Sequence, residues 1–159
     1  MIAWRWGNGF VTRVRVASPL PELRTMAGAR ARLVLIVEDD KTTGDLLARA
    51  INDQRGYSAL TVRSADEALD ALGRVDPDLL VVDIRMPGMS GLELYDRVRA
   101  DPRFRSLPVV FETGTGREHA QDLRDRGIAT YIKKPFDLDE LVRFVKRLVP
   151  PRNGTKLAP

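Results

Sequence analysis

The sequence predicts an α/β fold built on a doubly wound, five-stranded parallel sheet. Five short runs of apolar residues alternate along the chain with segments whose apolar residues recur at helical spacing. Strands that are apolar throughout are typical of a parallel sheet covered by helices on both faces. Right-handed crossovers between such strands give a doubly wound sheet. The length of 159 residues fits one domain of this kind.

The first two strands are predicted at 33–37 and 57–62. The run Leu-Val-Leu-Ile-Val at 33–37 ends abruptly at three consecutive acids. The helix between the two strands is indicated by four apolar residues at helical spacing, which are Leu46, Leu47, Ala50 and Ile51. A second helix is expected to begin near Ser64, because Ser64 and Glu67 have the spacing of a capping box.

The third strand is predicted at 79–82 and ends at Asp83. Ser90 and Glu93 form a second predicted capping box, which starts the third helix. The apolar face of that helix consists of Leu92, Leu94, Tyr95 and Val98. A fourth strand is predicted at 109–111.

The last third of the chain adds two helices and a strand. The fourth strand ends at Thr113, and a polar helix from about 117 to 126 stops at Gly127, a typical C-terminal glycine. A fifth strand is predicted at 129–132 and ends at Lys134. The final helix is predicted from a third capping box and an apolar stripe, which are Asp137 with Glu140, and Leu138, Leu141, Val142, Val145, Leu148 and Val149.

The composition excludes several classes of protein. The chain has no cysteine and one histidine, so a disulfide framework, a thiolate zinc site, an iron–sulfur cluster and a multi-histidine metal centre are ruled out. No apolar run approaches the ~18 residues that span a bilayer. The N-terminus lacks the continuous apolar segment of a secretory signal. We therefore expect a cytoplasmic protein with no membrane partner.

The positive charge is concentrated at the N-terminus. Residues 1–32 carry six arginines and one acid, a net charge of +5, whereas the rest of the chain carries 20 basic and 21 acidic residues, a net charge of −1. We divide the chain into a basic, poorly ordered extension at 1–31, a domain at 32–149 and a short polar tail at 150–159. Nucleic-acid binding by the extension stays open, as does a native start at Met26.

Polar residues follow four of the five predicted strands. In a doubly wound sheet the ligand site lies beyond the carboxyl ends of the strands, and the residues there are Glu38, Asp39, Asp83, Thr113 and Lys134. Three carboxylates close together repel and need a shared cation, and a rigid all-oxygen set suits Mg²⁺. A carboxylate can form an acyl phosphate as a nucleophile, while a lysine and a hydroxyl contact phosphoryl oxygens. The set is what aspartyl phosphorylation requires.

Residues 32–149 resemble the receiver domain of bacterial response regulators. The resemblance rests on segments in a fixed order, which are Leu-Ile-Val-Glu-Asp-Asp at 35–40, Val-Asp-Ile-Arg-Met-Pro-Gly-Met-Ser-Gly at 82–91, Thr113, and Tyr-Ile-Lys-Lys-Pro-Phe at 131–136. It implies the (βα)5 flavodoxin-like receiver fold. It also implies that Asp83 accepts a phosphoryl group from a histidine kinase or a histidine phosphotransfer protein, in a reaction that depends on Mg²⁺.

The same resemblance assigns roles to individual residues. Glu38, Asp39, Asp83 and the backbone carbonyl of Arg85 match the metal ligands. Thr113 matches the hydroxyl that contacts the phosphoryl group, and Tyr131 matches the aromatic switch. Lys134 matches the lysine that pairs with the phosphoryl group, and its peptide bond to Pro135 is cis in the family. The family then binds downstream proteins through the face formed by the helix at 117–126, the strand at 129–132 and the last helix. We expect no nucleic acid to bind the receiver itself.

Three features depart from the family pattern. Glu112 replaces a residue that is usually apolar, Gly114 stands where Ala or Ser is common, and the segment at 113–127 is about one residue shorter than usual. About ten residues follow the last helix, so we expect a stand-alone receiver that catalyses at most its own phosphorylation and dephosphorylation. The alternative is a receiver-fold module that binds proteins without being phosphorylated.

Overall fold

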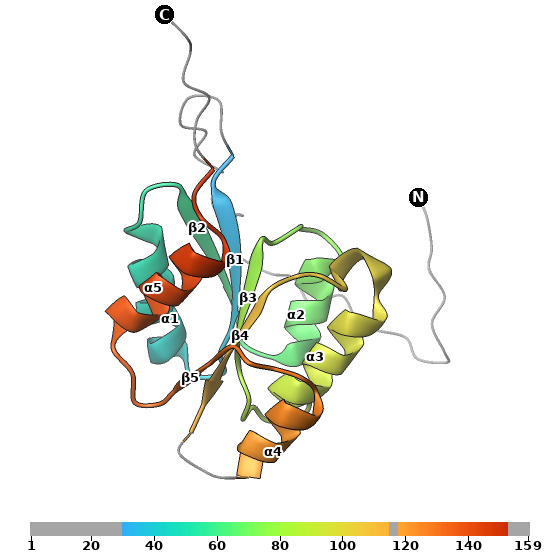
Figure 1. Ribbon diagram of the computed structural model, residues 1–159. Coiled ribbons are helices and arrows are strands. Elements are labelled where there is room, and N and C mark those ends of the chain that lie inside the picture. The colour runs from blue at the N-terminus through green and yellow to red at the C-terminus, as the bar shows by residue number, and fades with distance from the viewer. Residues whose placement is uncertain (1–29, 115–117, 153–159) are drawn as a thin grey trace, which may run out of the picture.

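The computed structural model describes residues 30–114 and 118–152. Within them, five parallel strands form one sheet in the order β2-β1-β3-β4-β5, as Figure 1 shows. The strands are β1 (Arg32–Val37), β2 (Tyr57–Val62), β3 (Leu79–Asp83), β4 (Val109–Thr113) and β5 (Tyr131–Lys133). The order steps outward from β1 in both directions, so the sheet is doubly wound as predicted.

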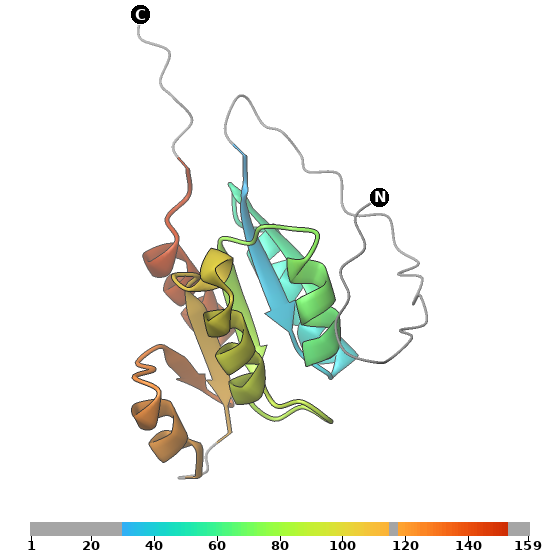
Figure 2. The ribbon, with the colours of Figure 1, turned by 90° about the vertical axis from the view of Figure 1, so that its right-hand side faces the viewer.

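Helices cover both faces of the sheet. They are α1 (Lys41–Asn52), α2 (Ala65–Leu72), α3 (Gly91–Ala100), α4 (Glu118–Asp125) and α5 (Leu138–Leu148), with a short 3₁₀ turn at Pro102–Phe104. In Figures 1 and 2, α1 and α5 lie on one face and α2, α3 and α4 on the other. No helix among the described residues is long and apolar enough to cross a membrane.

The strands contribute to two separate hydrophobic cores because successive side chains point to opposite faces of a sheet. On β1, Val34 and Ile36 pack with α1 and α5, whereas Leu35 and Val37 pack with α2 and α3. On β4, Val110 and Phe111 divide in the same way. The fully apolar strands predicted from the sequence are therefore buried on both sides.

Side-chain caps determine where the first helices begin. Asp40 starts α1 by accepting a hydrogen bond from Thr43 N at 2.7 Å. Ser64 accepts from Glu67 N at the start of α2. At α3 both arms of the predicted capping box are present, since Ser90 accepts from Glu93 N and Glu93 accepts from Ser90 N. The Asp40 cap starts α1 directly after Glu38 and Asp39, two of the predicted site residues.

Three of the local predictions are wrong or only partly right. At α2 the second arm of the predicted capping box is missing, because the Glu67 carboxylate accepts from Arg63 N instead of from Ser64 N. Asp137 caps α5 by accepting from Asp139 N instead of from Glu140 N, so the third capping box does not form as predicted. Leu46 is 50% exposed and does not belong to the buried stripe of α1, which consists of Gly44, Leu47 and Ile51. Most of the predicted extension and most of the predicted tail lie outside the described residues, so the division of the chain into segments remains a prediction.

Candidate functional site

Three carboxylates gather at one edge of the sheet. Glu38 and Asp39 follow β1, and Asp83 is the last residue of β3. Because β1 and β3 are neighbouring parallel strands, paired at Val37 and Val82, their carboxyl ends meet at this edge. One oxygen from each carboxylate lies within 4.8 Å of the others. Glu38 is buried, whereas Asp39 and Asp83 remain partly exposed and accessible from outside.

Lys134 lies among these carboxylates. Its Nζ donates to Glu38 Oε2 at 2.8 Å and to Asp83 Oδ2 at 2.9 Å, and Glu112 Oε2 is 3.3 Å away. Burial alone would lower the pKa of Lys134. The hydrogen bonds to Asp83 and Glu38, helped by the charge of Glu112, outweigh burial and raise this pKa above its ordinary value. Lys134 is therefore a cation over the whole physiological range of pH.

The backbone around Lys134 keeps it next to β4. The residue before it pairs with Thr113 in the parallel register of β4 and β5. Lys134 N then donates to Thr113 O at 2.7 Å. The following peptide bond, Lys134–Pro135, is cis, in agreement with the prediction. The side chain of Lys134 therefore leaves the sheet at the edge where the three acids lie.

The two predicted switch residues lie on β4 and β5. Thr113 is buried and its Oγ1 donates to Gly114 O at 3.1 Å. Tyr131, the first residue of β5, is 37% exposed, so its ring lies at the surface of the protein. The structure thus shows where both side chains lie, whereas their movement on phosphorylation remains a prediction.

Arg85 belongs to the loop that follows β3. Its backbone N donates to Asp83 Oδ1 at 3.1 Å, whereas Lys134 Nζ donates to the other oxygen, Oδ2, so the two donors together orient the Asp83 carboxylate. The Arg85 guanidinium lies against Gly114, where an added Cβ would be 2.7 Å from Arg85 Nη2. The unusual glycine at 114 therefore leaves room for the Arg85 side chain. The role of the Arg85 carbonyl as a metal ligand stays a prediction.

Glu112 is a member of the site that the sequence analysis did not include among its functional residues. It is 1% exposed, and among the described residues neither of its carboxylate oxygens has a well-formed hydrogen bond. Burial raises the pKa of Glu112 to about 7, against the lowering effect of the Lys134 charge, and the charges of Glu38 and Asp83 raise it further. The signal in the sequence was a charged residue inside an otherwise apolar strand.

We expect Glu112→Leu to stabilise the metal-free protein at pH 8. The folded protein keeps the Glu112 proton between about pH 4.5 and 7, where the unfolded chain has lost it. The contribution of Glu112 to stability therefore decreases as the pH rises through this window, by up to about 3 kcal/mol. Leucine does not titrate, so Glu112→Leu should lack this pH-dependent loss of stability. Urea unfolding in EDTA at pH 5 and pH 8 measures the effect, and an unchanged difference between the two pH values in Glu112→Leu would contradict it.

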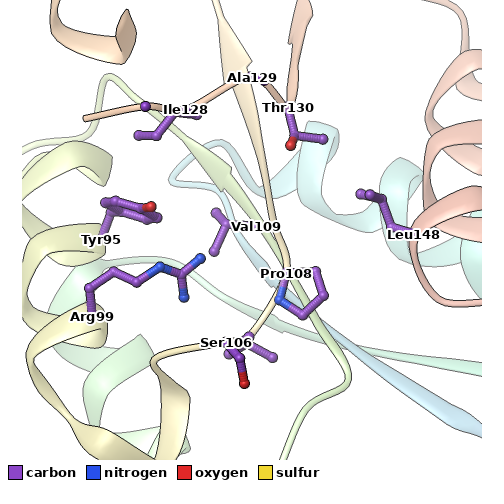
Figure 3. A pocket seen from close by; sticks show the side chains of 11 residues that line it. Tyr95, Arg99, Ser106, Pro108, Val109, Ile128, Ala129, Thr130 and Leu148 are labelled. Atoms are coloured by element: carbon purple, nitrogen blue, oxygen red, sulfur yellow. The ribbon is translucent and has the colours of Figure 1, made fainter. Parts of the chain in front are cut away.

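Two hollows adjoin the fold at opposite ends of the strands. One lies next to the acids, beside the loop after β3, and is lined by Ile84, Arg85, Met86, Pro87, Ser90, Leu92, His119 and Asp122. The other, in Figure 3, lies where β4 and β5 begin and is therefore remote from the acids. In it the Arg99 guanidinium stacks on the Tyr95 ring at 4.5 Å and donates to Phe104 O at 2.9 Å. Of the described residues that line this hollow, Arg99 is the one cation, and its guanidinium is already occupied by these two contacts.

Comparisons with known proteins identify the family of the domain. Residues 34–146 match the family described as the response regulator receiver domain. The DNA-binding transcriptional regulator NtrC of Klebsiella pneumoniae is 40% identical over 115 residues, which are 72% of this chain but 24% of that regulator. An uncharacterized 14.6 kDa protein of Leptolyngbya boryana is also 40% identical over 115 residues, 72% of this chain and 87% of its own length.

A solved structure supports the same fold. The crystal structure of a putative response regulator from Chloroflexus aurantiacus superposes with a TM-score of 0.68 at 33% sequence identity. The match covers 75% of this chain and 98% of that one. The chain thus spans about a quarter of the length of the NtrC regulator and nearly all of the shorter relatives.

Proposed function

Because the chain belongs to the response regulator receiver family, we propose that it accepts a phosphoryl group on Asp83 and signals through a protein-binding face that phosphorylation changes. Receiver domains are signalling domains, and the catalysis that we propose is limited to this chain's own phosphorylation and dephosphorylation. The observation that carries the proposal is the contact of Lys134 with Asp83 at 2.9 Å, beside two further carboxylates.

The orientation of Asp83 supports its role as the nucleophile. Lys134 Nζ binds Oδ2 and Arg85 N binds Oδ1, so both carboxylate oxygens are held while the side chain stays partly exposed. In the proposed reaction one of these oxygens attacks the phosphorus of a phosphohistidine. A P–O bond forms, the P–N bond breaks, and its electron pair leaves with the imidazole. Lys134 then donates to an oxygen of the transferred group.

The acidic cluster fits a Mg²⁺ ion. Glu38, Asp39 and Asp83 offer only oxygen ligands, with one oxygen from each within 4.8 Å of the others. The resemblance to the family adds the Arg85 carbonyl. When bound, Mg²⁺ would neutralise negative charge on the transferring group.

The signalling step in this proposal relies on Thr113 and Tyr131. A phosphoryl group adds almost two negative charges and three acceptor oxygens. Thr113 Oγ1, which now donates to Gly114 O, would donate to the phosphoryl group instead. Tyr131, which is exposed, would follow Thr113 inward and alter the face of α4, β5 and α5. The donor would be a histidine kinase or phosphotransfer protein, and the altered face would bind a downstream protein.

Asp83→Asn tests the proposal directly. We expect the wild-type protein, incubated with acetyl phosphate and Mg²⁺, to gain the mass of one phosphoryl group, because among the described residues Asp83 is the only partly exposed carboxylate that Lys134 contacts. The gain should be absent in Asp83→Asn and in wild type with EDTA. Intact-protein mass spectrometry measures it. No gain in wild type, under conditions where calorimetry detects bound Mg²⁺, would contradict the proposal and favour a module that acts without phosphorylation.

A further inference from the structure

The phosphoryl transfer described above does not use Glu112. This carboxyl is 1% exposed and lacks a well-formed hydrogen bond to any described residue, and its nearest cation is Lys134 Nζ at 3.3 Å. Burying a carboxylate is strongly unfavourable unless a partner compensates it. Glu112 nevertheless lies on β4 directly after two apolar core residues, Val110 and Phe111. Its contact with Lys134 is therefore the feature that must explain why a carboxylate is buried here.

Carboxylates from three neighbouring strands surround the Lys134 ammonium. Glu38 follows β1, Asp83 ends β3, and Glu112 lies on β4 opposite Asp83 in the register. An ammonium group has three N–H donors, and the three nearest carboxylate oxygens lie at 2.8, 2.9 and 3.3 Å. A phosphoryl oxygen on Asp83 must therefore replace one of these contacts.

The three contacts differ in what phosphorylation does to them. Phosphorylation converts the Asp83 carboxylate into an acyl phosphate, so that contact passes to the new group. Glu38 belongs to the carboxylates that fit Mg²⁺. Glu112 is buried on β4, and neither event removes its oxygen from Lys134. It is thus the one carboxylate of the three that stays available to Lys134 after phosphorylation.

We propose that Glu112 is a positioning residue that competes with the phosphoryl group for Lys134 and so shortens the lifetime of the phosphorylated state. The inference rests on the function proposed above. Glu112 acts in two ways in the same direction: it draws the ammonium toward β4, and its negative charge repels a phosphoryl group that is itself negative. The same charge attracts Mg²⁺. Removing it therefore has opposite effects on the binding of an anion and of a cation.

The experiment compares wild type with Glu112→Gln and Glu112→Leu at pH 8. Beryllofluoride at saturating Mg²⁺ serves as the probe of phosphoryl binding, and Mg²⁺ alone as the probe of cation binding, both measured by calorimetry. We expect both variants to bind beryllofluoride with a dissociation constant about tenfold lower, the size of one charge-assisted hydrogen bond. We expect Mg²⁺ alone to bind several-fold more weakly. The aspartyl phosphate formed from acetyl phosphate should decay correspondingly more slowly.

A matched variant controls for the loss of charge as such. Glu67 on α2 is exposed and accepts a hydrogen bond from Arg63 N, a contact that glutamine can keep. It is not among the carboxylates within ion-pair distance of Lys134. Glu67→Gln should therefore leave both dissociation constants within about twofold of wild type, in keeping with the weak effect of an exposed charge.

The outcomes separate this inference from the function on which it rests. Unchanged or weaker beryllofluoride binding in both Glu112 variants overturns the competition. Equal shifts of beryllofluoride and Mg²⁺ binding in the same direction also overturn it, because they indicate a general loosening of the site. If wild type is phosphorylated and both Glu112 variants behave like wild type, only the inference fails. If wild type neither gains a phosphoryl group nor binds beryllofluoride, both proposals fail.

Discussion

Lys134→Ala is expected to destabilise the metal-free protein by about 3 kcal/mol at pH 8. Within residues 30–114 and 118–152, the Lys134 ammonium is the only cation at ion-pair distance from Glu38, Asp83 and Glu112. The side chains of Glu38 and Glu112 are 3% and 1% exposed, so water cannot replace the lost partner. The variant leaves two buried carboxylates uncompensated, and such groups destabilise more than an intact buried pair stabilises.

The pH dependence of this loss has a definite sign. Burial raises the pKa of Glu112 in the folded protein and the Lys134 charge lowers it, so without Lys134 this carboxyl keeps its proton on folding over a wider range of pH. Protonated carboxyls need no cation, so the stability loss is largest at pH 8 and shrinks toward pH 5. Urea unfolding of both proteins at the two pH values, in EDTA, measures this. A loss under about 1 kcal/mol that does not change with pH would contradict a neutralising role for Lys134.

Added Mg²⁺ provides a second readout on the same variant. A bound divalent cation supplies positive charge to the carboxylates that Lys134 otherwise neutralises. Saturating Mg²⁺ should therefore raise the unfolding midpoint of Lys134→Ala more than that of wild type. Lys134→Arg is the matched control, because it keeps the charge while changing the shape of the donor. It should retain most of the stability and should not show the enlarged Mg²⁺ effect.

The parts of the site that follow strand ends could be predicted from the sequence. An apolar run that stops at a charged residue gives the end of a buried strand, and parallel strands bring such ends to one edge. That reasoning located Glu38, Asp39, Asp83, Thr113 and Lys134 at one edge. In the structure the three acids have oxygens within 4.8 Å of one another, and Lys134 contacts Glu38 and Asp83. The prediction depended only on local pattern and on strand direction.

Glu112 could not be assigned in this way. It follows Val110 and Phe111 on a strand that is buried on both faces. The alternation of side chains between the two faces therefore predicts no polar environment for Glu112. Whether such a carboxyl stays inside depends on its partner, and Lys134 comes from the far end of the next strand along the chain. A pairing of that kind is a property of the tertiary structure. The sequence showed only that the residue was unusual.

The local errors have a similar origin. Leu46 and Leu47 are adjacent in α1, and helical spacing admits either to the apolar stripe, but only Leu47 faces the sheet. At α5 the residue spacing allowed Asp137 to pair with Glu140, whereas the cap accepts from Asp139 N. In both cases two neighbouring positions satisfy the same sequence pattern. The packing of the helix against the sheet decides between them.

Gly91→Ala is expected to be the most damaging small substitution near Asp83. Gly91 is the first residue of α3, and its N donates to Ile84 O at 3.0 Å, which ties the helix to the end of β3. A Cβ at this position would overlap the Asp83 carbonyl oxygen and lie 2.8 Å from Val82 Cγ1. The obstacle is backbone and cannot rotate away. We expect a loss of about 3 kcal/mol in the free energy of unfolding.

The same substitution should also weaken the metal site. The added methyl group would push against the Asp83 backbone at the end of β3, and we expect this to displace Asp83 from Glu38 and Asp39. We expect Mg²⁺ to bind at least about tenfold more weakly in Gly91→Ala, a displacement effect that calorimetry measures. Gly88→Ala is the matched control in the same loop. Gly88 has a φ of +77° but nothing within 4 Å of an added Cβ, so alanine there costs about 1 kcal/mol of backbone strain. If Gly91→Ala were no more destabilising than Gly88→Ala, the explanation would be wrong: position 91 would not need glycine to let α3 approach Asp83 closely.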